Sequence, residues 1–282
     1  GRWRRNGRNG RNGRRRSGLP PGWQDVTATA VAHWALLDDD ERAELGELMD
    51  ALLRTKRWEA ARGFDLTDEV RVVIAAQAGL LILGLGVDYY RAVGSIIVHP
   101  TTMTFRGVRP GPAPGIVTDA PLPILGQAQH QRGPIVIAWD AARADARHPE
   151  RGHNVVFHEF AHKLDMLDDL VDGTPPLADR TARERWIDVC TAEYRLLRAG
   201  GGGHLLRSYA TVNPGEFFAV ATEVFFDLPA EMLEQKPDLY GVLRDFYRQD
   251  PARRQRRAAD RRADPQDPPG PEAPARNRPP VP

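Results

Sequence analysis

Apolar residues recur at helical spacing in the first part of the chain. After an acidic run at residues 38–41, an apolar face predicts a helix to about residue 62; this face is formed by Leu45, Leu48, Met49 and Leu52. A second apolar stretch follows Thr67-Asp68-Glu69, a capping sequence, and predicts a helix through about Leu85. The pattern therefore indicates an N-terminal helical subdomain at residues 35–90.

The pattern changes to that of strands in the middle of the chain. Residues 92–99 and 135–139 are short apolar runs rich in isoleucine and valine, and each predicts a strand. Residues 100–133 hold many prolines and glycines, so we expect an irregular β region there. The expected fold class is α+β, mostly helical with a small β-sheet.

Helical patterns return in the second half. Asn154 can cap a helix over residues 155–167, and three further helical stretches follow at about 179–199, 214–226 and 230–248. The helix that begins after Asn154 is apolar around its polar residues, which predicts that it is buried; its apolar residues are Val155, Val156, Phe157, Phe160, Ala161 and Leu164.

Both ends of the chain lack apolar patterning. Residues 1–20 are rich in Arg, Gly and Asn, and residues 251–282 are rich in Pro, Arg and Asp. We expect both to be disordered tails on either side of a single domain at residues 21–250. The basic N-terminal tail is expected to attract nucleic acid only weakly, and nothing else in the chain points to a nucleic-acid partner.

The amino-acid composition limits the cell compartment and the type of metal site that can be expected. The 282 residues are 41% hydrophobic and 27% charged, with a net charge of +1, which is typical of a globular protein. Cys190 is the one cysteine, so an intrachain disulfide and a cysteine-rich zinc site are excluded. The longest apolar stretch, residues 75–87, is too short to span a membrane. We expect a cytoplasmic protein without a membrane association.

The helix after Asn154 carries a candidate metal site. His158 and His162 are four residues apart, so both imidazoles lie on one helix face and can reach one ion. Glu159 follows the first histidine, where its carboxylate can take a proton from a water molecule at the metal. The spacing His-Glu-x-x-His is typical of zinc peptidases.

The sequence leaves the third ligand open. Asp168 lies where an extended version of the motif has its third ligand, but that version needs a helix-breaking glycine at the position that Asp165 occupies. Glu216 and Glu223 lie on a downstream helix that begins at Asn213 with a proline in its first turn. Because they are seven residues apart, they share a face, so one could bind the metal while the other supports a histidine.

Two long motifs resemble those of a known family. HEFAHKLDMLD at residues 158–168 and YATVNPGEFFAVATEVFF at residues 209–226 resemble the Mlc titration factor A family of zinc peptidases. Further similarity surrounds Arg57-Trp58-Glu59, the segment Gly133-Pro134-Ile135-Val136 and the sequence FYRQDP that ends at Pro251. The resemblance implies a zincin-like fold, related to the catalytic domain of anthrax lethal factor, and aminopeptidase activity of the gluzincin type.

The resemblance also implies roles for individual residues. One zinc ion per chain would be bound by His158, His162 and Glu216, with Glu159 as the general base and Tyr209 as the active-site tyrosine. A phenol hydroxyl beside the metal can donate a hydrogen bond to the carbonyl oxygen that becomes negative during hydrolysis, which is an independent chemical reason for the tyrosine.

The sequence and the resemblance also suggest supporting residues, a substrate-binding strand and a protein partner. Glu223 and Asp165 are candidates for residues that hydrogen-bond to a metal ligand without contacting the metal. The strand at residues 134–139 is a candidate edge for an extended peptide substrate, or else a core strand. Some members of the family bind a transcriptional repressor, so the alternative function is a regulatory protein that sequesters such a repressor, with peptidase activity secondary.

Overall fold

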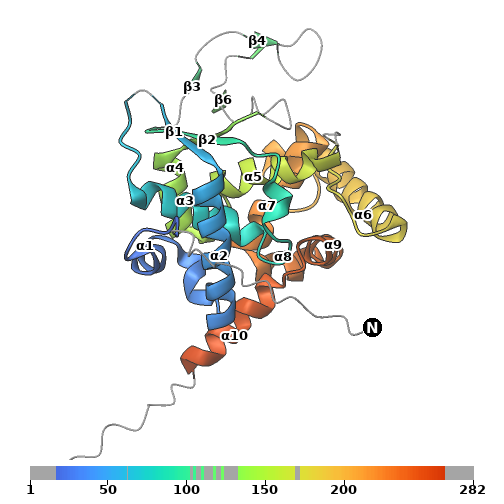
Figure 1. Ribbon diagram of the computed structural model, residues 1–282. Coiled ribbons are helices and arrows are strands. Elements are labelled where there is room, and N and C mark those ends of the chain that lie inside the picture. Colours follow the sequence, from blue (N-terminus) through green and yellow to red (C-terminus); the bar gives the residue numbers. More distant parts are fainter. Residues whose placement is uncertain are drawn as a thin grey trace, which may run out of the picture.

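The chain folds into a mostly helical body with a small parallel sheet along one side of it (Figure 1). The structure, a computed structural model, describes residues 17–61, 63–101, 133–168 and 172–263, and the backbone of four short strands between residues 104 and 123. This architecture confirms the expected fold class, a mostly helical α+β protein of the zincin type.

Within the described residues, the α-helices are α1 (Trp23–Ala30), α2 (Asp39–Thr55), α3 (Asp68–Leu81), α4 (Trp139–Arg147), α5 (Val155–Asp165), α6 (Arg180–Arg198), α7 (Pro214–Asp227), α8 (Pro229–Gln235), α9 (Pro237–Tyr247) and α10 (Pro251–Ala263). The short 3-10 helices there are η1 (Ala32–Leu36), η2 (Val87–Tyr90), η3 (Pro149–Arg151), η4 (Met166–Asp168) and η5 (Ser208–Thr211). The strands are β1 (Arg57–Ala60), β2 (Ser95–His99), β3 (Thr104–Phe105), β4 (Arg109–Pro110), β5 (Val117–Thr118), β6 (Leu122–Pro123) and β7 (Ile135–Ala138). No helix in this part of the chain is long and apolar enough to cross a membrane.

The main sheet has three parallel strands in the order β1-β2-β7. Its central strand buries Ile96 and Val98 completely, and β7 buries Ile135 and Ile137 in the same way. Helices α4 and α5 pack against β7, so the sheet and the helical body share one core. Two antiparallel pairs, β3 with β6 and β4 with β5, lie in the stretch where an irregular β region was expected.

The first predicted helix is shorter than expected, because a strand follows it. Helix α2 ends at Thr55, and Lys56 adopts an extended conformation. Strand β1 then pairs with β2, with Arg57 beside Ser95 in the register. This pairing joins segments about forty residues apart, so local periodicity cannot reveal it.

The last predicted helix, residues 230–248, is two helices. The break lies at Lys236, which has φ −139° and ψ 61° and precedes Pro237. A residue before proline is disfavoured in the helical conformation, and the proline ring occupies the first turn of α9. The Lys-Pro sequence was therefore a usable signal for the break.

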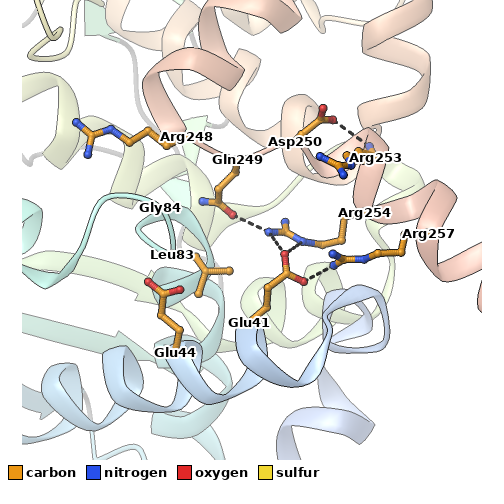
Figure 2. A pocket seen from close by; sticks show the side chains of 10 residues that line it. All are labelled: Glu41, Glu44, Leu83, Gly84, Arg248, Gln249, Asp250, Arg253, Arg254 and Arg257. Atoms are coloured by element: carbon orange, nitrogen blue, oxygen red, sulfur yellow. Dashed lines mark hydrogen bonds and ion pairs between the residues drawn. The ribbon is translucent and has the colours of Figure 1, made fainter.

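Residues 251–263 form helix α10, where a disordered tail was expected. Asp250 caps it by accepting a hydrogen bond from the amide of Arg253, at 2.9 Å. Glu41 of α2 accepts hydrogen bonds from Arg254 at 3.0 Å and Arg257 at 2.6 Å, as Figure 2 shows. The polar composition indicated disorder, but an ion-pair partner far away in the sequence docks the helix. The rest of this tail, residues 264–282, and residues 1–16 of the other tail lie outside the described residues.

Replacing Glu41 with glutamine is expected to loosen α10. Glutamine keeps the capping box with Asp38 but loses the charge that binds Arg254 and Arg257. Hydrogen bonds to charged groups contribute roughly 1.5–3 kcal/mol, and partial exposure reduces this to about 1–2 kcal/mol of unfolding free energy. Urea unfolding measures the difference. Glu44→Gln, one turn along α2, is the matched control, and equal stability of the two variants would contradict the docking role.

Candidate metal centre

Helix α5 holds the two histidines in the core. Asn154 caps it by accepting a hydrogen bond from the amide of Phe157 at 3.0 Å, and every residue of the helix is buried. The rings of His158 and His162 lie on one face, with their Nε2 atoms 3.2 Å apart. The predicted spacing therefore produces two nitrogen atoms that converge on one point.

Helix α7 brings a carboxylate to the same point. Asn213 caps this helix by accepting from the amide of Glu216 at 2.9 Å, which fixes the first turn. The Oε2 atom of Glu216 lies 3.0 Å from Nε2 of His158 and 3.4 Å from Nε2 of His162. One ligand atom from each of these three residues lies within 4.8 Å of the others, which makes them a group able to hold a metal ion.

The electrostatics of this group favour a bound cation. Burial lowers the pKa of His158, but the carboxylates of Glu216 and Glu223 outweigh it and raise this pKa to about 10. Burial opposes the charge on Glu216 as well, yet the two imidazoles hold its pKa well below the usual range. Two imidazole nitrogens and one carboxylate oxygen form a common donor set for a catalytic divalent metal, and the residues fit such an ion.

Glu159 lies beside this group with an unused oxygen. Its side chain is buried, and Oε1 has no hydrogen-bond partner among the described residues. Burial raises the pKa of this carboxyl, although the nearby imidazoles of His158 and His162 lower it in part. A buried acceptor without a partner is costly, so it usually has a functional reason.

Tyr209 reaches the site from η5. Its ring centroid lies 5.9 Å from that of His158, and the charge of the Glu216 carboxylate acts on its hydroxyl. Burial and the charge of Glu216 raise the pKa of this phenol well above its usual value, so the hydroxyl keeps its proton at neutral pH. It can therefore donate a hydrogen bond to another oxygen at the site.

Glu223 supports the centre from behind. Its side chain is fully buried, and Oε1 lies 2.7 Å from Nδ1 of His158. Its Oε2 accepts from the backbone amide of Asn154 at 2.8 Å. An ionised carboxylate can only accept, so Glu223 keeps a proton on Nδ1 of His158. A metal ion that replaced the proton on Nε2 would then meet the lone pair of that atom.

Arg207 completes this arrangement and was missed in the sequence. Its guanidinium donates two hydrogen bonds to Glu223, at 2.9 and 2.6 Å. In a chain rich in arginine, nothing local distinguishes this one, except that it precedes Tyr209 by two residues.

The structure thus brings together the five residues assigned from the family resemblance, and it places Glu223 at the back of His158. The other supporting candidate, Asp165, is fully buried on α5. Burial raises the pKa of Tyr247, and the charge of Asp165 raises it further. The alternative ligand Asp168 ends η4, and its side chain lies outside the described residues. The cavity of Figure 2 is lined by none of the five residues assigned from the resemblance.

The chain is similar in sequence to several known proteins. The model of the family described as glucose-regulated metallo-peptidase M90 matches residues 2–248. An uncharacterized protein of Synechocystis sp. is 36% identical over 232 residues, covering 81% of this chain and 84% of that protein. Mlc titration factor A of Edwardsiella ictaluri is 31% identical over 246 residues, covering 83% and 92% of the two chains. The protein of that name from Pectobacterium atrosepticum is 32% identical over 239 residues, covering 82% and 87%.

Proposed function

This chain belongs to the M90 family of glucose-regulated metallopeptidases, and we propose that it hydrolyses peptide bonds with one zinc ion held by His158, His162 and Glu216. The observation that carries the proposal is the convergence of three ligand atoms from two helices beside the unpaired Oε1 atom of Glu159. A bound zinc ion would supply Lewis acidity toward the peptide carbonyl and lower the pKa of a water molecule.

The residues of the chain perform the proton transfers. Glu159 accepts a proton from the attacking water and delivers it to the nitrogen of the leaving amine. Its raised pKa suits both steps, because a strongly acidic carboxyl would release the proton too readily to accept it. Tyr209 donates its hydrogen bond to the former carbonyl oxygen as negative charge develops there.

Strand β7 is the proposed binding edge for the substrate. Within the described residues β7 pairs on one side, with β2, and it packs against α5. Lys163 of α5 donates a hydrogen bond to the carbonyl of Gly133 at 3.0 Å, which ties the start of this strand to the helix of the histidines. An extended peptide added to β7 would therefore lie alongside the metal ligands.

The aminopeptidase type of activity is testable by substrate choice. We expect the zinc-loaded protein to release fluorophore from aminoacyl substrates with a free amino group and to leave the N-acetylated forms intact. Cleavage of an N-blocked, internally quenched peptide at an inner bond would instead assign an endopeptidase. A zinc-loaded protein that cleaves neither kind of substrate would overturn the hydrolytic function.

A second candidate function rests on the names of the relatives. Mlc titration factor A is a name for a protein that titrates another factor, Mlc. We propose as the alternative that this chain binds a transcriptional regulator. The discriminating measurement is calorimetric titration with Mlc, using wild type and Glu159→Gln. Equal binding by both proteins supports this function, and absence of binding by both counts against it.

A further inference from the structure

Arg207 contacts two residues of the candidate site, the carboxylate of Glu223 and the ring of Tyr209. It lies at the N-terminal end of η5, two residues before Tyr209. Its side chain is about one-third exposed, whereas the carboxylate of Glu223 that it binds is fully buried. A forked guanidinium that pairs with a carboxylate through two nitrogens fixes the orientation of that carboxylate, which a single-point donor does not.

The orientation of the Glu223 carboxylate in turn affects the imidazole of His158. Each oxygen of Glu223 is shared between the guanidinium and one group of α5 or its cap: Oε1 with Nδ1 of His158, and Oε2 with the amide of Asn154. If the guanidinium is removed, the carboxylate keeps two partners but loses the clamp that sets its plane. The imidazole of His158 then has less to hold its Nε2 toward the other ligands.

The same guanidinium lies against the tyrosine. The Cζ atom of Arg207 is 6.0 Å from the centroid of the Tyr209 ring, within the range of a cation–π contact. The carbonyl of Arg207 also accepts a hydrogen bond from the amide of Ala210 at 3.0 Å, which closes the turn that carries the tyrosine. A variant that lacks the guanidinium loses the contact with the ring but keeps this backbone hydrogen bond, so it frees the side chain of Tyr209 without opening the turn.

We propose that Arg207 is a positioning residue that couples the metal ligand His158 to Tyr209, so that one side chain sets the geometry of both. This inference rests on the proposed zinc peptidase function. Arg207 acts through Glu223 and through the aromatic ring, and none of these contacts is with a proposed ligand atom or with Glu159.

The test compares Arg207→Ala and Arg207→Lys with the matched control Arg185→Ala. Arg185 forms an arginine–carboxylate pair with Asp245 at 3.0 Å, half exposed at the surface. Zinc affinity is measured by competition with a chromogenic chelator, which does not depend on turnover. We expect Arg207→Ala to lower zinc affinity by about 10- to 100-fold, as for other residues that support a metal ligand, and Arg207→Lys to fall between it and wild type. The control is expected to bind zinc like wild type.

A double-mutant cycle with Tyr209→Phe tests the coupling. We expect Tyr209→Phe to lower kcat by a smaller factor in the Arg207→Ala protein than in wild type, because the hydroxyl is already displaced there. Melting temperatures of the zinc-free proteins separate a folding defect from a positioning defect. If Arg207→Ala does not fold, Arg207→Lys takes its place in the cycle.

The outcomes separate this inference from the function on which it rests. A wild-type protein that binds no zinc overturns both. If wild type binds zinc, the Arg207 variants bind it equally tightly, and Tyr209→Phe lowers kcat by the same factor in each background, only the role of Arg207 is overturned. The role of Arg207 is also overturned if the variants lose zinc affinity only in proportion to the fraction of protein that is unfolded.

Discussion

Replacing Glu159 with glutamine is expected to remove turnover and leave the metal bound. Glutamine has nearly the same shape but cannot accept the proton of the attacking water. General acid–base catalysis typically contributes about 10²- to 10⁴-fold, so we expect kcat to fall within or beyond this range. The fold is expected to tolerate the change, because burial already disfavours the charged form of Glu159.

The measurement pairs metal content by elemental analysis with kcat on an aminoacyl substrate. Glu44→Gln, which makes the same chemical change away from the metal centre, is the control and is expected to retain full activity. If Glu159→Gln keeps zinc and most of its activity, Glu159 is not the base. If it loses zinc, the result reports on metal binding, and the role in proton transfer is then tested in zinc-saturated buffer.

The second large effect concerns the third ligand. Glu216→Gln is expected to lower zinc affinity by more than about 100-fold, since losing a residue that only supports a ligand already costs about 10- to 100-fold. The amide lacks the negative charge that both imidazoles now face at 3.0 and 3.4 Å. Chelator competition measures the affinity directly. Zinc is also expected to raise the melting temperature of wild type and not that of Glu216→Gln.

Asp168→Asn is the matched comparison for this prediction, because Asp168 was the other carboxylate that the sequence offered as a ligand. We expect this variant to bind zinc as tightly as wild type. The reverse result, with zinc lost in Asp168→Asn and retained in Glu216→Gln, would assign the ligand to the end of η4 and contradict the geometry at α7.

The parts of the site that depend on local spacing were predictable. His158 and His162 follow from a four-residue interval on a helix, and the caps of α5 and α7 follow from Asn154 and Asn213. Glu216 was only one of three candidates until the family resemblance singled it out. Spacing within one helix fixes a face, but it does not say which other helix will pack against that face.

The parts that were missed depend on contacts between distant segments. Strand β1 forms because β2 lies beside it, and α10 is docked by Glu41. Arg207 gains its importance from Glu223, sixteen residues further along the chain. Such partners are set by the tertiary fold, so composition and periodicity carry no trace of them.

The pairing of Glu41 with Arg254 has a consequence for the order of events during synthesis. The two residues are 213 positions apart, so at roughly 5–20 residues per second the ribosome makes Arg254 about 10–40 s after Glu41. All residues of the candidate metal centre are made within that interval. Helix α10, which Glu41 of α2 holds by ion pairs, is therefore added to a chain whose candidate metal-binding residues have already been translated.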